Sequence, residues 1–311
     1  MLWMAATARL DSCYTPFLST DWNLFNSLMS HSAKVDQYAV MGNPIAHSQS
    51  PGIHAQFAKQ TGESLAYEAI LVGIDHFAQA VDDFQQSGGC GLNITVPFKQ
   101  QAWSLAQVRS ERAELAGAVN TLMYQEGQWF GDNTDGVGLV NDLVQNHQIK
   151  LQGKKILVLG AGGAARGVLA PLLAQQPDVV MIANRTASKA RELATLFSNH
   201  GNIKGMGFDE LPEQPFDCII NATAASLQGE VPPIPVACIG AQTCAYDMMY
   251  AAHATAFLQW AQKNGAQSCI DGLGMLVEQA AESFYIWRHV RPQTEPVITY
   301  LREKMLSSLE G

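Results

Sequence analysis

A glycine-rich run lies where the chain passes from an apolar segment into a helix-like one. Its residues are Gly160, Ala161, Gly162, Gly163, Ala164 and Ala165, which satisfy the pattern G-x-G-x-x-G/A. The first glycine permits a tight turn, the second lets the backbone approach a pyrophosphate, and the small third residue lets the helix pack on the strand. Free N–H groups at the start of the helix can then bind the phosphates. Alone, the pattern can be an ordinary glycine-rich turn, but the strand and helix around it favour a dinucleotide site.

The next predicted strand distinguishes between the two common dinucleotides. It ends in Asn184, Arg185 and Thr186, with Lys189 one turn later and no carboxylate before Glu192. An NAD site has Asp or Glu here to bind the ribose 2′-hydroxyl, whereas arginine offers several donors to a 2′-phosphate. The sequence therefore predicts NADP, and the alternative is that Arg185 is a solvated loop residue.

Three polar clusters in the N-terminal half have residue types that suit a small ligand. Ser48 and Ser50 lie at a helix start, where hydroxyls and the helix dipole suit a carboxylate, although simple N-capping explains Ser50 alone better. Lys99 lies just beyond a strand, where ligands bind in open α/β sheets, although a lone lysine there is usually solvated. The run 131–136, Gly-Asp-Asn-Thr-Asp-Gly, is by composition a surface turn.

Alternating strand-like and helix-like segments must position these residues. The first stretch has predicted strands at 38–42, 67–72 and 92–96 and helices at 50–62 and 75–86. The second has strands at 155–160, 178–183, 216–220 and 243–247 and helices at 163–174, 187–198 and 254–264. We also expect a connecting helix at 135–146, a loop-rich segment at 201–215, and final helices at 273–288 and 295–309. This order predicts an α/β fold of two open-sheet domains, largely parallel, with helices on both faces.

Bulk composition excludes several classes of protein. A chain of 311 residues, 47% hydrophobic and 15% charged, suits two folded domains and argues against disorder. Its net charge of -9 offers no basic surface for nucleic acid or an anionic membrane, and no apolar stretch suits a membrane span. The six cysteines have neither C-x-x-C nor zinc-ligand spacing. We therefore expect reduced cysteines, no metal and a cytoplasmic location.

Taken together, the motifs point to one family. In order, they are G-N-P-I-x-H-S-x-S-P, N-x-T-V-P-F-K, G-A-V-N-T, G-D-N-T-D-G, G-A-G-G-A-x-R, N-R-T, Y-D-M-x-Y and D-G-L-G-M-L-x-x-Q-A. From about residue 38 to 298 the chain resembles the shikimate dehydrogenase family, which reduces 3-dehydroshikimate to shikimate with NADPH. The resemblance implies a substrate domain of residues 35–135 and 271–311, a Rossmann NADP-binding domain of residues 136–270, and C-terminal helices that return to the first domain.

The resemblance also implies a role for each matching residue. Lys99 and Asp135 form the catalytic pair beside the carbonyl that is reduced. The remaining substrate-binding residues are Ser48, Ser50 and Tyr250 at the carboxylate, Asn120 and Gln279 at ring hydroxyls, and Thr95 in the pocket wall. The cofactor-binding residues are the run 160–165, Asn184, Arg185, Thr186, Lys189, Met248 and Gly272. The chemistry agrees, because ketone reduction creates an alkoxide that needs a proton or a nearby positive charge, which a lysine supplies.

The sequence departs from the family pattern near the expected nicotinamide site. The usual N-A-T-S-x-G is here Asn221-Ala222-Thr223-Ala224-Ala225-Ser226, so a serine is lost at 224 and a glycine at 226. The nearest alternative function is a quinate/shikimate dehydrogenase, but relatives of that type carry serine at Thr95 and an acidic residue at Arg185. A non-catalytic ligand sensor is a second alternative, and such a protein is expected to lose Lys99 and Asp135.

Two further features lie outside the motifs. Residues 1–34 have no counterpart in the resemblance, so we expect either a flexible extension or a start codon assigned too far upstream, since Met29 lies nine residues before the first predicted strand. The sequence leaves both a monomer and a homodimer open, and we expect the partner to be the small-molecule substrate.

Overall fold

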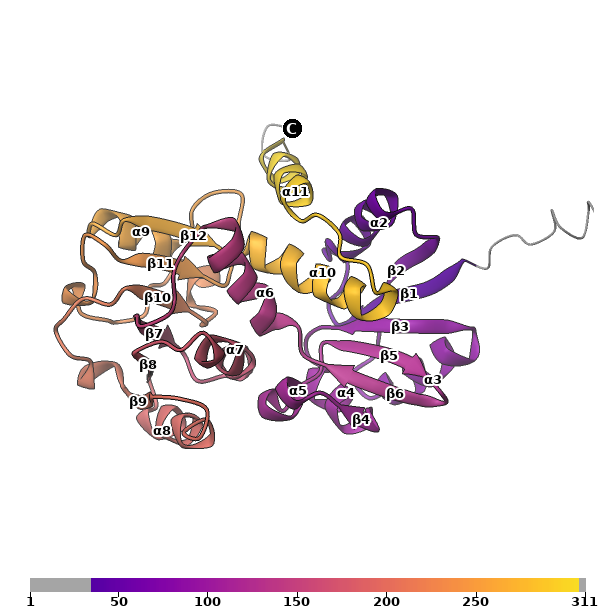
Figure 1. Ribbon diagram of the computed structural model, residues 1–311, viewed down its shortest axis with the longest axis horizontal. Coiled ribbons are helices and arrows are strands. Elements are labelled where there is room, and N and C mark those ends of the chain that lie inside the picture. Colours follow the sequence, from indigo (N-terminus) through magenta and orange to yellow (C-terminus); the bar gives the residue numbers. More distant parts are fainter. Residues whose placement is uncertain (1–34, 308–311) are drawn as a thin grey trace, which may run out of the picture. The chain divides into compact units, whose positions relative to one another are not determined.

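A computed structural model describes residues 35–307 of the protein (Figure 1). The expectations for residues 1–34, for Cys13 and for the last residues of the C-terminal helix lie outside the described residues. Two six-stranded sheets with flanking helices make up the described part, which confirms the predicted α/β fold. No helix within residues 35–307 is long and apolar enough to cross a membrane.

The first sheet has the strand order β2-β1-β3-β5-β6-β4. Its strands are β1 (Asp36–Gly42), β2 (Leu65–Leu71), β3 (Gly89–Ile94), β4 (Val108–Arg109), β5 (Thr121–Gln125) and β6 (Gln128–Asp132). The accompanying helices are α2 (Ser50–Thr61), α3 (Phe77–Gln86), α4 (Lys99–Leu105) and α5 (Glu111–Ala116). β1 pairs in parallel with β2 and β3, whereas β5 runs antiparallel to β3 and β6. The predicted parallel character therefore holds except at β5.

The second sheet is parallel throughout and has the order β12-β11-β10-β7-β8-β9. Its strands are β7 (Lys155–Leu159), β8 (Val179–Asn184), β9 (Ile203–Gly207), β10 (Cys218–Asn221), β11 (Cys244–Asp247) and β12 (Ser268–Asp271). The helices are α7 (Gly163–Ala174), α8 (Ala187–Leu196) and α9 (Ala256–Lys263), with 3-10 turns at Phe208–Glu210, Ala225–Gln228 and Val236–Cys238. This is the Rossmann order. From β7 the chain adds β8 and β9 on one side, and it then returns to add β10, β11 and β12 on the other side, so the order of addition reverses between β7 and β10.

The last two helices follow the second sheet in sequence but pack with elements of the first. In α10 (Leu273–Arg288), Phe284 shares a buried cluster with Phe57 of α2 and with residues of α11 (Glu295–Ser307). The Trp287 indole donates a 3.0 Å hydrogen bond to a backbone oxygen of β5. The predicted return of the C-terminal helices is therefore confirmed (Figure 1).

A connecting helix, α6 (Asp135–Asn141), continues as a π-helical turn (Asp142–Asn146) and lies against α10 (Figure 1). Glycines make this approach close. A Cβ atom on Gly138 would lie 2.8 Å from the Gln279 backbone nitrogen, and one on Gly274 would lie 1.9 Å from an Asp142 carboxylate oxygen. The two helices can therefore bring side chains from distant parts of the sequence together.

The structure adds to one prediction about local structure and overturns another. The segment 201–215, predicted to be loop-rich, also contains the unpredicted strand β9, which extends the second sheet. Gly205 interrupts the apolar pattern of β9. Glycine stands there at a close contact, since a Cβ atom on Gly205 would lie 2.1 Å from the Ala190 carbonyl oxygen. The run 131–136 is not a surface turn, because Asp132, Asn133 and Thr134 are all buried.

Candidate active site

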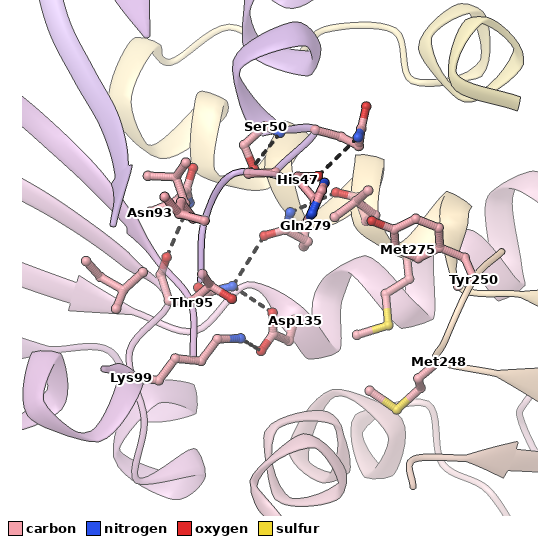
Figure 2. A pocket seen from close by; sticks show the side chains of 18 of the residues that line it. His47, Ser50, Asn93, Thr95, Lys99, Asp135, Met248, Tyr250, Met275 and Gln279 are labelled. Atoms are coloured by element: carbon pink, nitrogen blue, oxygen red, sulfur yellow. Dashed lines mark hydrogen bonds and ion pairs between the residues drawn. The ribbon is translucent and has the colours of Figure 1, made fainter. Parts of the chain in front are cut away.

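A pocket of about 320 Å³ contains every residue that the sequence assigned to the substrate (Figure 2). The assigned residues that line it are Ser48, Ser50, Thr95, Lys99, Asn120, Asp135, Tyr250 and Gln279. They come from the segments that follow β1, β3 and β11, from the start of α6, and from β5 and α10 and their flanks. The carboxyl ends of neighbouring strands thus converge on one pocket, as expected for an α/β sheet.

Lys99 and Asp135 form an ion pair in this pocket. Lys99 is the first residue of α4 and Asp135 the first residue of α6. Lys99 Nζ lies 2.6 Å from Asp135 Oδ2, and the two side chains are 29% and 18% exposed. Asn120 Nδ2 donates a 2.8 Å bond to the other oxygen, Asp135 Oδ1. Both carboxylate oxygens therefore have a donor, which fixes the carboxylate while the ammonium keeps an open side.

Three hydroxyl side chains line another part of the pocket. Ser50 is the first residue of α2, and Gln49 occupies the N-cap position without a side-chain bond, so the interpretation of Ser50 as a simple N-cap is wrong. Ser48 Oγ instead accepts from the Ser50 backbone N–H at 3.3 Å. Burial, and then the charge of Asp271, raise the pKa of the Tyr250 phenol, which keeps it a protonated donor. Two hydroxyls at a helix start, with the Tyr250 phenol in the same pocket, suit a carboxylate ligand.

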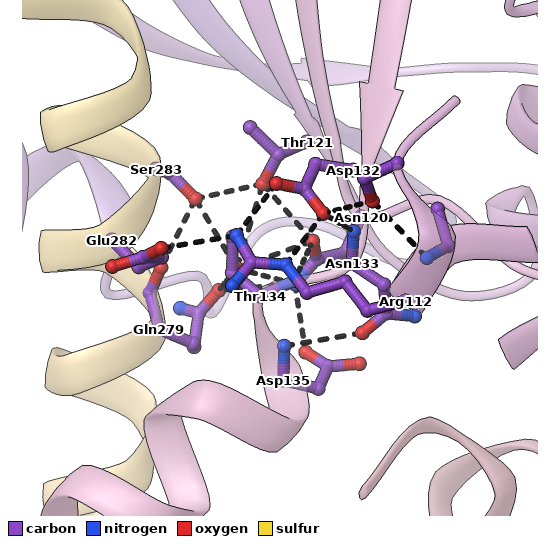
Figure 3. A network of polar contacts seen from close by, with 12 residues as sticks. Arg112, Asn120, Thr121, Asp132, Asn133, Thr134, Asp135, Gln279, Glu282 and Ser283 are labelled. Carbon is purple, nitrogen blue, oxygen red and sulfur yellow. Dashed lines mark hydrogen bonds and ion pairs between the residues drawn. The ribbon is translucent and has the colours of Figure 1, made fainter. Parts of the chain in front are cut away.

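Asn120 and Gln279 join a buried polar network beside the ion pair (Figure 3). Asn120 is 2% exposed, and its oxygen accepts from the Thr134 backbone N–H at 2.9 Å. Its Nδ2 lies 3.4 Å from Gln279 Oε1. Ser283 and Thr121 continue the network through a 2.7 Å hydroxyl contact. The network thus links the Asp135 segment to α10.

The glycine-rich run follows β7, beside the point where the winding of the second sheet reverses. Gly160 has φ +106°, a conformation that side chains disfavour, and α7 begins at Gly163. A Cβ atom on Gly162 or Gly163 would meet no atom within 4 Å, so no other part of the described chain fills the space over this backbone. Ala165 is fully buried beneath the turn. Open backbone N–H groups at a helix start fit a pyrophosphate.

The residues assigned to the adenosine end lie at the last residue of β8 and just beyond it. Arg185, Thr186 and Lys189 are exposed, and Asn184 Nδ2 donates a 3.0 Å bond to the Thr186 carbonyl, which shapes the loop. Within residues 35–307, no carboxylate forms an ion pair with Arg185 or Lys189. Two cations that protein carboxylates leave unpaired fit a phosphate on the ribose.

Met248 and Gly272 also line the pocket. The Gly272 backbone N–H donates to the Met249 carbonyl at 3.1 Å, and a Cβ atom on Gly272 would lie only 2.3 Å from the Met248 carbonyl oxygen. Glycine at 272 therefore lets the start of α10 approach the segment after β11, where the nicotinamide end of a cofactor is expected.

Ser226, which stands where the family usually has glycine, takes part in the buried polar contacts of Asp247. Ser226 Oγ donates a 2.6 Å bond to Asp247 Oδ2, and Asn221 Nδ2 donates to Ser226 Oγ at 3.1 Å. Asp247 is fully buried and also accepts from Thr255 Oγ1 at 2.6 Å. The serine therefore helps to hold the strand end from which Met248 and Tyr250 extend.

Sequence reasoning missed several residues of the pocket wall. His47, Asn93 and Met275 line it beside the predicted residues (Figure 2). Asn93 Oδ1 accepts from the Tyr67 hydroxyl at 2.7 Å, and its Nδ2 donates to Ser283 Oγ at 3.0 Å. His47 and Asn93 lie inside motifs, so their position in those motifs was a usable signal. Within the described residues, no group of three or more His, Cys, Asp or Glu could hold a metal ion, and Cys90, Cys218, Cys238, Cys244 and Cys269 are free.

Comparison with known proteins identifies the family. Three protein-family models match the chain. They are described as "Shikimate dehydrogenase substrate binding domain" (residues 40–122), "Shikimate / quinate 5-dehydrogenase" (residues 142–228) and "Shikimate 5'-dehydrogenase C-terminal domain" (residues 272–299). Shikimate dehydrogenase (NADP(+)) of Hahella chejuensis is 56% identical over 269 residues, which are 86% of this chain and 99% of the relative. An Ael1 enzyme from Pseudomonas putida is 44% identical with a TM-score of 0.82, covering 86% of this chain and 98% of that one. Shikimate 5-dehydrogenase from Thermus thermophilus, solved with NADP(H) and shikimate, is 30% identical with a TM-score of 0.76, covering 86% and 99%. The chain therefore belongs to the shikimate dehydrogenase family.

Proposed function

We propose that this protein is an NADP-dependent shikimate dehydrogenase, which reduces 3-dehydroshikimate reversibly to shikimate in chorismate and aromatic amino-acid biosynthesis. The observation that carries the proposal is the Lys99–Asp135 ion pair, with Nζ and Oδ2 2.6 Å apart, in one pocket with Ser48, Ser50 and Tyr250. A single pocket thus offers an acid/base pair for a carbonyl and hydroxyl donors for a carboxylate. Two curated relatives, each 56% identical over 86% of this chain, carry the same activity in their names.

The side chains divide the reaction between them. When bound, the reduced nicotinamide supplies the hydride to the carbonyl carbon. Lys99 donates a proton to the carbonyl oxygen as negative charge develops there, and Asp135 orients the ammonium. In the reverse direction Lys99 accepts the hydroxyl proton. Asn120 holds Asp135 from the side opposite Lys99, since its Nδ2 lies 2.8 Å from Oδ1.

The remaining assignments follow the same pocket. Ser48, Ser50 and Tyr250 bind the substrate carboxylate, Asn120 and Gln279 bind ring hydroxyls, and Thr95 limits the pocket wall. The cofactor is held by the run 160–165 at its pyrophosphate, by Asn184, Arg185, Thr186 and Lys189 at its adenosine end, and by Met248 and Gly272 near the nicotinamide. The open space over Gly162 and Gly163 supports the pyrophosphate assignment.

We further propose the domain division. Residues 35–135 and 271–311 form the substrate domain, and residues 136–270 form the NADP-binding domain. The buried cluster that joins α2 with α10 and α11 supports the discontinuous first domain. The biosynthetic role and the free cysteines among residues 35–307 support a cytoplasmic location. The binding partner is the small-molecule substrate, and either a monomer or a homodimer is compatible with this division.

A spectrophotometric assay with purified protein tests the proposal. Nicotinamide reduction is followed with shikimate or quinate, each paired with NADP or NAD. We expect fast turnover only with shikimate and NADP. Comparable turnover with quinate or NAD would indicate the broader quinate/shikimate type, and binding without turnover in every pairing would indicate a ligand sensor.

Lys99→Ala tests the catalytic assignment in the same assay. Removal of a general acid/base group should lower kcat by about a hundredfold or more while the KM for shikimate changes less. Lys154→Ala is the matched control, because Lys154 also pairs with a carboxylate, Asp217 at 2.8 Å, but does not line the pocket. Wild-type kcat in Lys99→Ala would remove Lys99 from the chemistry.

A further inference from the structure

A chain of alternating charges connects α5, the end of β6 and α10, the helix that carries Gln279 (Figure 3). Arg112 of α5 binds both oxygens of Asp132, with Nε to Oδ1 at 2.7 Å and a terminal nitrogen to Oδ2 at 2.6 Å. The same terminal nitrogen donates to Glu282 of α10 at 3.0 Å. Arg291 binds the second Glu282 oxygen at 2.7 Å. These four residues do not line the pocket, so the mechanism above does not use them.

Asp132 is the last residue of β6 and lies three positions before Asp135. Its side chain is 5% exposed, so the carboxylate requires partners to remain charged. Besides Arg112, Oδ1 accepts from Ser110 Oγ at 2.5 Å and from the Asn133 backbone N–H at 2.7 Å. The orientation of this carboxylate therefore sets where the backbone leaves the sheet toward Asp135.

Side-chain bonds then continue step by step along this segment. The Asn133 side chain donates to the Ala118 carbonyl at 3.0 Å and accepts from the Asp135 backbone N–H at 3.2 Å. Thr134 is held through its backbone N–H by Asn120. The segment from Asp132 to Asp135 is thus fixed at one end by Arg112 and at the other by Lys99 and Asn120.

The other branch of the charge chain reaches α10 on the face that carries Gln279. Glu282 follows Gln279 by three residues, so both lie on the same side of the helix. Glu282 is buried, and the carboxylates of Asp132 and Glu282 raise the pKa of Arg112 against the lowering effect of its own burial. The Arg112 guanidinium of α5 is therefore hydrogen-bonded both to the segment that leads to Asp135 and to the face of α10 that carries Gln279.

We propose that Arg112 is a positioning residue for hydride transfer, because its fork holds Asp132 and Glu282 in the arrangement that places Asp135 against Lys99 and opposite Gln279. A lysine cannot reproduce this arrangement, since an ammonium is a single point charge without the planar pair of donors. This inference rests on the proposed function, because it requires Asp135 to act on the substrate.

Arg112→Lys tests the proposal in the full-length protein. A small displacement of reacting groups lowers the rate strongly, so we expect kcat to fall by about tenfold while the KM for NADP stays at the wild-type value. We also expect a larger primary deuterium isotope effect on kcat with shikimate deuterated at the carbinol carbon, because hydride transfer becomes the slower step. A smaller folded fraction would lower kcat without changing the isotope effect or the KM.

Arg109→Lys is the matched control. Arg109 adjoins α5 and also pairs with a glutamate, Glu114 at 2.6 Å, but its other bonds go to the backbone of residues 103 and 106. We expect wild-type kcat and isotope effect. Glu282→Gln provides a second variant, which keeps the side-chain volume and should change kcat and the isotope effect in the same direction as Arg112→Lys, by a smaller factor.

The outcomes separate this proposal from the function on which it rests. Wild-type kcat and isotope effect in Arg112→Lys, or loss of kcat at an unchanged isotope effect, would overturn the positioning role. Failure of both Arg112→Lys and Glu282→Gln to fold would assign the charge chain to stability and would overturn it too. Asp135→Asn is measured in parallel, and full turnover of that variant would instead refute the catalytic assignment of Asp135.

Discussion

At the residue scale, Arg185 is the side chain whose surroundings bear most directly on cofactor choice. It is exposed after β8, and no carboxylate among residues 35–307 forms an ion pair with it. In Arg185→Ala, loss of charge-assisted hydrogen bonds to the 2′-phosphate should raise the KM for NADP by about tenfold to a hundredfold. The KM for NAD should stay near its wild-type value, because NAD has no phosphate there. Steady-state kinetics with both cofactors measures the difference.

Arg191→Ala is the control for this substitution, since Arg191 lies in α8, is exposed and pairs with Glu210 at 2.5 Å. It should leave both KM values unchanged. An equal rise in KM for NADP and NAD in Arg185→Ala would show that Arg185 supports the loop rather than the phosphate.

Residues of the candidate site were predictable where their motifs are local in sequence. Ser48 and Lys99 each lie beside the end of a strand that the apolar pattern identified, so the α/β topology alone places them on one edge of the sheet. Arg112 gave no such signal. Its partners Asp132 and Glu282 lie 20 and 170 residues away along the chain, and only the fold brings them together.

At the element scale, the strands buried on both faces were predicted best. β7 and β8 read as continuous apolar runs, as central parallel strands do. The hairpin of β5 and β6 was not predicted. Its two-residue turn, Glu126-Gly127, has φ +52° and +80°, and glutamate is an uncommon residue for a left-handed position. This sheet therefore contains an antiparallel strand, and only β1, β2 and β3 follow the predicted alternation.

Gly138 lies where α6 packs against α10, so a substitution there tests whether this packing positions the active-site residues. A methyl group in Gly138→Ala would lie 2.8 Å from Gln279 Cβ and 2.8 Å from its backbone nitrogen. Overpacking at backbone contacts should lower the free energy of unfolding by about 1–3 kcal/mol. Because Gln279 itself is displaced, we also expect a higher KM for shikimate. Urea unfolding and steady-state kinetics measure the two effects.

Gly52→Ala is the matched control within a helix of the first sheet. A Cβ atom on Gly52 would meet nothing within 4 Å, so alanine should leave the stability unchanged or raise it slightly. If Gly138→Ala behaves in the same way, α6 and α10 do not depend on this close contact.

At the scale of the whole molecule, His54 lies where the N-terminal and C-terminal parts of the described chain meet. It belongs to α2, stacks on Tyr67 of β2 with ring centroids 4.2 Å apart, and lies near Phe284 and Trp287 of α10. Its ring is fully buried, and within residues 35–307 neither nitrogen has a hydrogen-bond partner. Burial lowers the pKa of His54 to about 3, against a smaller opposing effect of Asn93. The ring is therefore neutral whenever the protein is folded near neutral pH.

This buried ring predicts that acid destabilises the fold in a defined direction. Above the ordinary histidine pKa of 6.5 the ring is neutral in both states and contributes nothing to the pH dependence. Below pH 6.5 the His54 ring binds a proton in the unfolded chain, but in the folded chain it stays neutral until about pH 3. The free energy of unfolding therefore falls as the pH falls. Between pH 7 and pH 4, urea unfolding of the wild type should lose about 3 kcal/mol more than that of His54→Leu, which cannot titrate. His76→Leu, at an exposed histidine, should follow the wild-type curve. Parallel curves for wild type and His54→Leu would mean that the folded protein accommodates a charged ring at this junction, and acid sensitivity would then have to arise from its carboxylates.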